Sequence, residues 1–243
     1  MEEISMNCWP ALETILLDGW VLRFAGGATK RSNSVNPVYE SSMPVEDKIK
    51  ICEEIYSSKN LKTVFKMTGH TKTTDLDMIL ENMGYEKNTI VSVQTLSVDT
   101  FNVEPFESKI ISDEFKDDWA DCFMDFAGIE QDQRPAYKEI LRHVFLKKCF
   151  LTINLKGKPV CCGLGILDGR FLGIFDIAVS PEYRGWGFGR LAMEGILGWG
   201  KEQNANTAFL QVFHDNSLAL KLYKKMGFQE IYQYWYRVKD NRQ

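Results

Sequence analysis

One segment of the chain combines a strand, a turn and a helix. Residues 171–179 are nearly all apolar or β-branched, which is typical of a strand buried on both faces. Turn-forming residues at 180–182 end that strand, and a helix is predicted over 190–203. Between the turn and the helix, glycines alternate with other residues through 184–189.

These glycines predict an anion-binding turn. The first N–H groups of a helix have no partner within the helix, and they lie at the positive end of its dipole. Because Gly185, Gly187 and Gly189 precede the helix, few side chains can shield those groups. A phosphate could therefore approach the backbone.

Other glycine motifs fit the turn less well. Gly187-x-Gly189-x-x-Ala192 formally matches a dinucleotide fingerprint, but that motif places its glycines directly after the strand and needs an acidic residue about twenty residues on. A nucleotide P-loop ends in Gly-Lys-Ser/Thr, whereas Gly189 is followed by Arg190. A flexible turn without a ligand is the remaining alternative.

Hydrophobic periodicity predicts the other elements, in which strands alternate with helices. Strands are expected over 18–25, 62–67, 88–98, 109–111, 150–155, 160–167 and 207–213, and helices from 44, over 74–83, over 113–126 and over 136–146. Residues 63–67 parallel 208–212, and 80–86 parallel 223–229. The first hundred residues therefore look like a degenerate copy of the C-terminal lobe, although helix-Gly-aromatic-strand is also a common turn.

Composition sets broad limits. A chain of 243 residues that is 44% hydrophobic can bury a good core in one or two units. A net charge of −4 and a pI near 5.5 argue against nucleic acid and against an anionic membrane as partners. The sequence has no run of about 18 apolar residues and no basic start typical of a signal peptide, so we expect a cytoplasmic protein, either a monomer or a homodimer.

The six cysteines do not predict a metal site. None of them forms a C-x-x-C pair, and the adjacent Cys161 and Cys162 have poor chelate geometry. Most of the cysteines lie in apolar or helical patterns, where a free cysteine acts as a small hydrophobic residue.

Two motifs resemble the GNAT superfamily of N-acetyltransferases. Residues 184–189 match the family's motif A, Gln/Arg-x-x-Gly-x-Gly/Ala, in full. Motif B has its counterpart in Asn216-x-x-Ala219-x-x-x-Tyr223-x-x-x-Gly227-Phe228. The resemblance implies an α+β acyltransferase fold with a mixed, mostly antiparallel sheet flanked by helices. It also implies a partial GNAT-like lobe at 1–100 and a catalytic domain at 101–243.

The resemblance further implies a reaction and a set of binding residues. An amine attacks the thioester of acetyl-CoA directly, and the acceptor is a small molecule, an amino acid or a protein N-terminus. The thioester is expected in the splay between 171–179 and 207–213. Cofactor contacts are implied for Ile177, Ala178, Val179, Arg184, Gly185, Trp186, Gly187, Phe188, Gly189, Asn216 and Tyr223.

Tyr223 matches the tyrosine that the family places near the thioester sulfur. A phenol is protonated at neutral pH and can donate to a departing thiolate. The alternative is core packing, because Ala219, Tyr223 and Gly227 share a helical face. Asn216 could likewise be a helix cap rather than a pantetheine contact, or both.

The sequence leaves the general base open. Some relatives have a glutamate five residues before the motif B asparagine, where this chain has Gln211. Asp176 is one candidate, since a carboxylate in an apolar strand should have a raised pKa. The other candidates are Glu130, Asp132, His214 and a water relay.

The competing functions come from different classes. Gln211 would fit a catalytically silent acyl-CoA-binding module, and the dinucleotide spacing would fit a nicotinamide-dependent oxidoreductase. Residues 32–44 contain no glycine, and Leu80 aligns with Tyr223, so the N-terminal unit is expected to bind no second acetyl-CoA. It could instead contribute Arg31 or Asn33 to the acceptor site.

Overall fold

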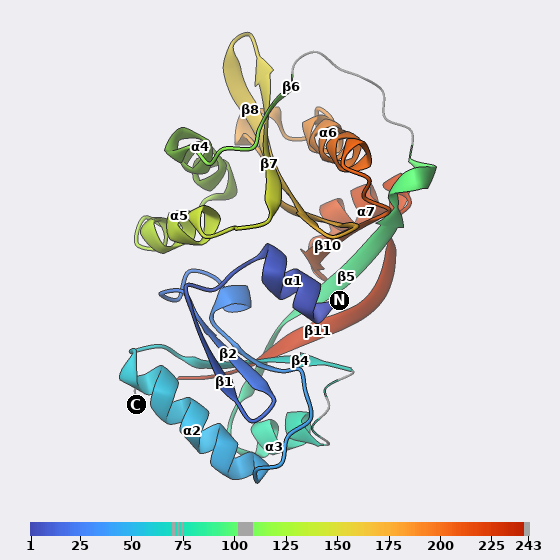
Figure 1. Cartoon of the computed structure of the whole chain (residues 1–243). Coiled ribbons are helices and arrows are strands. Elements are labelled where there is room, and N and C mark those ends of the chain that lie inside the picture. The colour runs from blue at the N-terminus through green and yellow to red at the C-terminus, as the bar shows by residue number, and fades with distance from the viewer. Residues whose placement is uncertain (70, 72, 74, 102–108, 241–243) are drawn as a thin grey trace.

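The computed structural model describes residues 1–69, 71, 73, 75–101 and 109–240. Its strands form one 11-stranded sheet in the order β1-β2-β3-β4-β11-β5-β10-β9-β8-β7-β6, which runs through the whole molecule (Figure 1). Most neighbouring strands are antiparallel, and β3 with β4 and β9 with β10 are parallel. The predicted mixed, mostly antiparallel sheet flanked by helices is confirmed.

The bounds of the elements are as follows. The strands are β1 Glu13–Leu17, β2 Trp20–Phe24, β3 Val35–Pro37, β4 Thr63–Thr68, β5 Glu86–Ser97, β6 Lys109–Ser112, β7 Lys147–Leu155, β8 Lys158–Asp168, β9 Phe171–Val179, β10 Thr207–Phe213 and β11 Gln229–Lys239. The helices are α1 Glu2–Cys8, α2 Val45–Ser58, α3 Leu76–Asn82, α4 Asp117–Ala127, α5 Arg134–Arg142, α6 Phe188–Glu202 and α7 Ser217–Met226. Short 3₁₀ turns are η1 Lys30–Ser32, η2 Val98–Thr100 and η3 Pro181–Tyr183.

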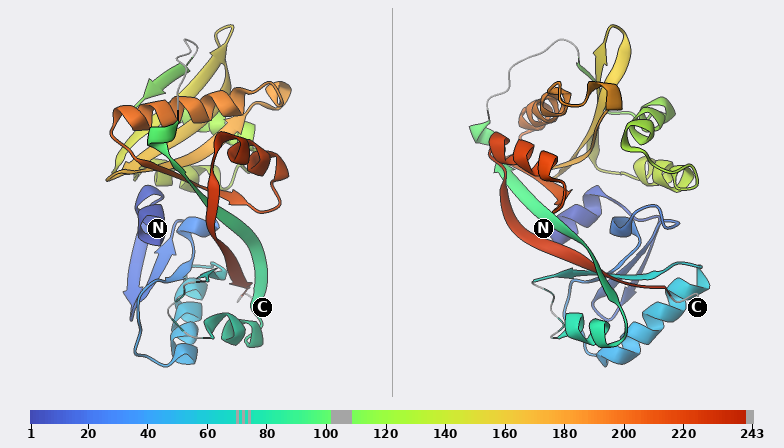
Figure 2. Two further views of the ribbon diagram at one scale, coloured as in Figure 1. Left: turned by 90° about the vertical axis from the view of Figure 1, so that its right-hand side faces the viewer. Right: turned by 180° about the vertical axis from the view of Figure 1, so that it is seen from behind.

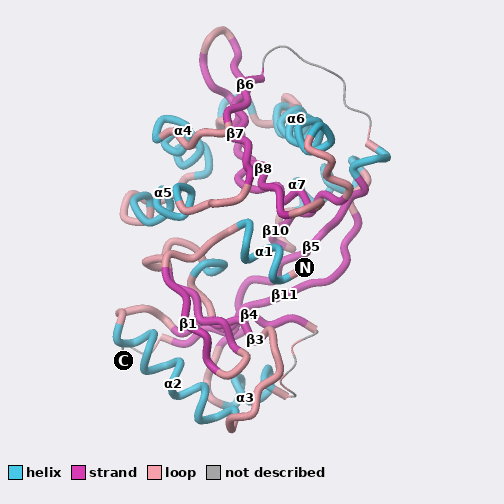
Figure 3. Tube along the Cα trace, in the orientation of Figure 1, coloured by secondary structure: helices cyan, strands magenta, loops and turns pink. Residues whose placement is uncertain are grey.

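The C-terminal half has helices on both faces of β6 to β10. Helix α6 packs on one face, and α4 with α5 covers the other (Figures 1 and 3). Met193 and Ile196 of α6 are fully buried against the sheet, and Trp119 and Tyr137 belong to the core on the opposite face. This two-faced packing agrees with the nearly continuous apolar sequence of β9.

The N-terminal half has its own core beneath β2 and β4. Helices α2 and α3 cover that part of the sheet, and Ile49, Cys52 and Tyr56 of α2 are fully buried. Helix α1 lies between the two halves (Figure 1) and contacts β8 and β9. The pattern did not predict α1, because so short a helix has little periodicity to detect.

Strands cross between the two halves. The C-terminal strand β11 lies between β4 and β5, and β5 lies between β11 and β10. Figure 2 shows these two long strands running side by side from one half to the other. The division into an N-terminal GNAT-like unit and a catalytic domain near residue 100 stays a prediction. One sheet contains strands from both sides of that position.

Several predicted boundaries differ from the structure. Asp18 and Gly19, with φ of 41° and 81°, form the turn between β1 and β2, so the strand expected from 18 begins at Trp20. A two-residue hairpin turn needs positive φ at both positions, which Asp-Gly tolerates. Helix α6 begins at Phe188, and α5 ends at Arg142. Thr74, the predicted start of α3, lies outside the described residues.

No helix in the described part of the chain is long and apolar enough to span a membrane.

Candidate active site

A β-bulge places Asp176 at the edge of a cleft. Cys162 pairs with Ala178 and Leu164 with Phe175, so two β9 residues, Asp176 and Ile177, face only Gly163 on β8. Asp176 has φ of 54°, which re-aims its side chain. A Cβ at position 163 would lie 2.7 Å from Cδ1 of Ile177 and 2.9 Å from Cδ1 of Ile196, so a larger residue there would displace both side chains.

The cleft opens where β9 and β10 separate. Their parallel pairing runs from Thr207 with Phe171 to Leu210 with Ile174 and ends there. Beyond that point β10 pairs only with β5, and β9 only with β8, within the described ladders. Beyond Ile174 the open edge of β9 therefore has no described strand on that side, and residues 175–177 line the cleft. This is the splay expected from the resemblance.

Both halves of the molecule line this cleft, which has a volume of about 560 Å³. The C-terminal half contributes β9, β10, β11, the N-cap and one residue of α7, and parts of α4 and α5, and the N-terminal half contributes residues 28–31 and β5. The charged, polar and aromatic residues of the lining include Lys30, Arg31, Tyr137, Phe175, Asp176, Gln211, Asn216, Tyr223, Tyr234 and Tyr236, and Ile177 lies beside Asp176.

Asp176 is the acidic residue of the cleft lining. Its Oδ1 accepts a hydrogen bond of 2.7 Å from the Tyr137 hydroxyl, and its Oδ2 is buried and has no hydrogen-bond partner among the described residues. Burial raises the pKa of Asp176 to about 6, although the positive charge of Arg31 and the Tyr137 hydrogen bond act in the opposite direction. Asp176 is thus mostly ionised at neutral pH, yet basic enough to accept a proton.

Tyr223 lies in the cleft wall on α7. Its ring packs against Phe228 at 5.9 Å, and its hydroxyl has no hydrogen bond among the described residues. Burial raises the pKa of Tyr223 to about 12, so the phenol is protonated at physiological pH. Packing and proton donation are compatible at this position.

Asn216 caps α7 and also lines the cleft. Its Oδ1 accepts the Ala219 N–H at 3.1 Å, which confirms the helix-cap interpretation. The pantetheine contact stays a prediction, and the side-chain amide N–H groups of Asn216 are not used by the cap.

The glycine turn exposes the start of α6. Gly185 and Gly187 have φ of 84° and 89°, and a Cβ built on either would meet no atom within 4 Å. Gly187 is the N-cap of the 15-residue α6 and provides no side chain to satisfy its amides. A Cβ on Gly189 would make only ordinary contact, 3.6 Å from Val179. The turn therefore fits an anionic group held by backbone N–H groups.

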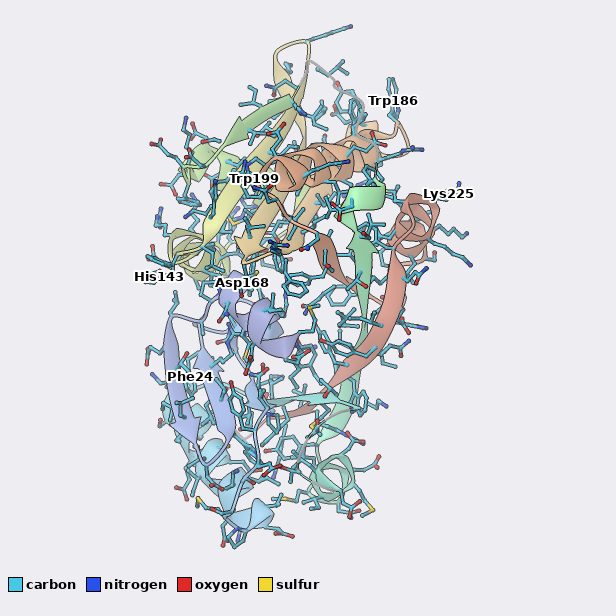
Figure 4. All side chains as sticks on the ribbon, turned by 45° about the vertical axis from the view of Figure 1, so that its right-hand side comes forward. Phe24, His143, Asp168, Trp186, Trp199 and Lys225 are labelled. Carbon is cyan, nitrogen blue, oxygen red and sulfur yellow. The ribbon has the colours of Figure 1, made fainter. Side chains whose placement is uncertain are left out.

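The side chains of the turn hold it in place. The Arg184 guanidinium donates to the carbonyls of Val179 at 3.4 Å and Phe126 at 3.1 Å, which ties the turn to β9 and α4. Trp186 is 69% exposed and points outward from the molecule (Figure 4). Phe188 packs edge-on against Tyr183. The cofactor contacts of Trp186 and Phe188 stay predictions.

The other base candidates lie elsewhere. Glu130, Asp132 and His214 are exposed and do not belong to the cleft lining. Gln211 does line the cleft, but its side chain donates to Ser5 Oγ at 2.7 Å and accepts from the Tyr234 hydroxyl at 3.2 Å. Gln211 therefore joins α1 to the sheet.

The N-terminal unit brings one of its two predicted residues to the cleft. Arg31 lines it. Asn33 instead accepts from the Ala25 and Gly27 N–H groups and donates to the Ala25 and Thr29 carbonyls, so it shapes the loop. Sequence reasoning missed Tyr137, Tyr234, Tyr236 and Lys30, because no local signal links them to Asp176.

Comparison with known families agrees with this geometry. Residues 110–228 match the acetyltransferase (GNAT) family, and residues 1–134 match the family described as probable histone acetyltransferase Rv0428c C-terminal. The chain belongs to the GNAT superfamily of acetyltransferases. The resemblance of its two motifs to that superfamily is thereby confirmed.

Individual relatives match nearly the whole chain. The uncharacterized N-acetyltransferase YobR of Bacillus subtilis is 28% identical over 244 residues, which covers 98% of this chain and 97% of YobR. The GCN5-related N-acetyltransferase of Kribbella flavida superposes with a TM-score of 0.71 at 10% identity, covering 98% and 95% of the two chains. A tandem GNAT protein from the clavulanic acid pathway gives 0.65 at 10% identity, covering 98% and 86%. These two structures share the fold of this GNAT acetyltransferase.

Proposed function

We propose that this GNAT acetyltransferase transfers the acetyl group of acetyl-CoA to a primary amine by direct attack in a ternary complex. The observation that carries the proposal is the position of Asp176 and Tyr223, which line one cleft at the splay of β9 and β10. A proton acceptor and a proton donor at one site are what an amine nucleophile and a thiolate leaving group require.

The cofactor's phosphates would bind at the glycine turn. Support comes from the open space at Gly185 and Gly187 and from the uncapped N-terminus of α6. The pantetheine arm would then extend along the open edge of β9, over Ile177, Ala178 and Val179, toward Asn216. Acetyl-CoA supplies an activated acyl group to this site.

Asp176 would act as the general base. An amine is mostly protonated at neutral pH, so the acceptor must lose a proton before or during attack. Asp176 is half-buried, faces the cleft and has one carboxylate oxygen without a partner. Gln211 on β10 stands where some relatives have a glutamate and cannot accept a proton, so in this protein the base would lie on β9 instead.

Tyr223 would act as the general acid, with its unpaired hydroxyl available to protonate the departing thiolate. Backbone N–H groups at the β9 bulge could stabilise negative charge on the carbonyl oxygen during attack. Tyr137 would hold Asp176 in place and is therefore a positioning residue.

An amine panel tests the proposal. Purified protein with acetyl-CoA should release free thiol only when an acceptor is present, and the product mass should increase by one acetyl group. Asp176→Asn should abolish most of this transfer, whereas Asp132→Asn, an exposed residue outside the cleft, should not. Thiol release independent of amine, or no transfer to any amine, would contradict the proposal.

A further inference from the structure

The charge of the cleft is not balanced by the protein itself. Its lining includes the charged side chains of Lys30, Arg31 and Asp176, so an ionised Asp176 leaves one positive charge in excess. Both cations come from the η1 turn of the N-terminal half, whereas the carboxylate comes from β9. Residues from both halves thus bring two cations and one carboxylate to the same cleft.

Arg31 is held on an aromatic platform. Its guanidinium carbon lies 4.6 Å from the Trp9 ring centroid and 5.4 Å from that of Phe175, and these two rings stack at 5.6 Å. The buried Arg23 fixes the backbone beneath it by donating a 2.6 Å hydrogen bond to the Arg31 carbonyl. The guanidinium is therefore fixed in place before any ligand arrives.

The guanidinium of Arg31 has no hydrogen bond or ion pair among the residues that the structure describes. Arginine carries a fork of N–H donors that suits a planar carboxylate. The charge of Asp176 is close enough to interact with Arg31, but the two do not form an ion pair, and stacking on rings replaces only part of the hydration that a half-buried guanidinium loses. An anionic ligand group would offset that loss.

Lys30 has only neutral partners in the described part of the chain. Its ammonium donates to Asn88 Oδ1 and, at 2.8 Å, to Thr89 Oγ1. Burial lowers the pKa of Lys30, and Lys62 adds to this effect. Among the described residues, neither of these two neighbouring cations forms an ion pair with a carboxylate, and Asp176 acts on Arg31 only through its nearby charge.

The phosphates of the cofactor do not account for these cations. The glycine turn at 185–189 is not among the residues that line the cleft, and it lies at the start of α6 in the C-terminal half. The η1 turn belongs to the N-terminal half, beside α1 (Figure 1). Between the two turns, the lining of β9 and β10 would hold the pantetheine arm and the reacting centre.

We propose that the acceptor is an amino acid whose carboxylate binds Arg31, with Lys30 nearby, while its amino group faces Asp176. The inference rests on the proposed function and specifies its substrate class. A zwitterion complements a cleft that is lined by both a cation and a carboxylate, because each of its charged groups finds an opposite charge there. The rings of Tyr137, Phe175, Tyr234 and Tyr236 give the cleft an aromatic lining suited to an apolar amino-acid side chain.

Matched ligand pairs test the carboxylate directly. We would measure by calorimetry how phenylalanine, leucine and their primary amides bind to the protein saturated with CoA, which has no acetyl group to transfer. Each amide keeps the size and the amine of its parent but lacks the negative charge. We expect the amino acids to bind about tenfold to a hundredfold more tightly than the amides, the range of a charge-assisted bidentate pair.

Variants assign that preference to Arg31. Arg31→Met should make acid and amide bind alike, and Arg31→Lys should restore part of the difference. Arg170→Met removes an exposed arginine outside the cleft and should keep the full preference. The acid-to-amide ratio is the readout, so a uniform loss of affinity through altered packing would not mimic the expected result.

The outcomes separate the two proposals. The amino-acid acceptor would be overturned, whatever the transfer assay gives, if acids and amides bound equally or if neither bound. It would also be overturned if a peptide, whose carboxylate is remote from its amine, bound as tightly as the free amino acids. A carboxylate preference that depends on Arg31, combined with no acetyl transfer from acetyl-CoA, would instead contradict the proposed function and leave the amino-acid site standing.

Discussion

The hydroxyl of Tyr137 lies 2.7 Å from Oδ1 of Asp176 and joins α5 to the bulge of β9. Burial, together with the nearby Asp176 carboxylate, raises the pKa of Tyr137 well above its ordinary value, so the phenol is the donor at any accessible pH. The hydrogen bond occupies one carboxylate oxygen and leaves Oδ2 without a partner. Tyr137 therefore orients the proposed base, and its hydrogen bond offsets part of the rise in the Asp176 pKa that burial causes.

Tyr137→Phe should move the pH dependence of catalysis. The hydrogen bond favours the ionised form of Asp176, so its loss should raise the Asp176 pKa. The acid limb of the profile of kcat/KM should then shift to higher pH by up to about one unit. Tyr39→Phe is the matched control, because the Tyr39 hydroxyl also donates a 2.7 Å hydrogen bond to a carboxylate, that of Glu3, but lies outside the cleft. It should leave the acid limb of the kcat/KM profile unchanged. A lower rate with an unmoved limb would reduce Tyr137 to a packing residue.

Asp176→Asn should nearly abolish turnover. An amide cannot accept the proton of the amine, so kcat should fall by about a hundredfold or more. In the unsubstituted protein, kcat/KM should rise with pH through about 6, the pKa of Asp176, provided that the amine of the acceptor does not itself titrate there. Full activity of Asp176→Asn would return the role of base to a water relay.

The same substitution should stabilise the fold at alkaline pH. The pKa of Asp176 is raised from an ordinary 3.8 to about 6, so the folded state disfavours the ionised form. This penalty is absent below pH about 4, grows as pH rises through the two pKa values, and is constant above about 6. At pH 8, Asp176→Asn should therefore raise the free energy of unfolding by about 1 to 3 kcal/mol, with little gain at pH 4. Equal effects at both pH values in thermal or urea unfolding would contradict the raised pKa.

Tyr223→Phe should lower turnover but preserve cofactor binding. The ring and its contact with Phe228 remain, and only the proton donor is lost. We expect kcat to fall about tenfold to a hundredfold, at the low end because a thiolate is already a fair leaving group. Stopped-flow thiol release and calorimetry with acetyl-CoA measure the two quantities separately. Unchanged turnover would assign Tyr223 to packing alone.

Gly187→Val should weaken acetyl-CoA binding by at least about tenfold, because a branched side chain would obstruct the amides at the start of α6. Its φ of 89° also makes any side chain there strained. Gly157→Val is the matched control, since Gly157 has φ of 77° and open space around it but lies in the turn between β7 and β8. Unchanged affinity for Gly187→Val in calorimetry would remove the phosphate-turn interpretation.

One acetyl-CoA should bind per chain. In the N-terminal half, the segment 32–44 has no glycine turn, and Leu80 is fully buried at the position that aligns with Tyr223.

A chain that begins at residue 101 should be insoluble, because it lacks β5 between β10 and β11. Saturation at two equivalents, or a soluble and active chain from 101 onward, would show that the N-terminal half has been misinterpreted.

Local chemistry in the sequence was enough to predict the β9 strand, the glycine turn, α6 and the Asn216 cap. Each depends on residues a few positions apart, whose side-chain periodicity and turn preferences act within one element. The GNAT family follows from the same local motifs, and so do the bounds of β9 and β10, 171–179 and 207–213, which the structure matches.

Tertiary structure alone decided how the two halves join and which side chains meet in the cleft. The insertion of β5 beside β10, the approach of Tyr137 to Asp176 and the arrival of Arg31 from the N-terminal half are contacts between distant segments. Hydrophobic periodicity specifies which face of a strand is buried, but it does not specify the neighbour that buries it. Asp176 could therefore be singled out from its apolar strand, whereas its hydrogen-bond partner Tyr137 and the cations that share its cleft depend on how the whole sheet assembles.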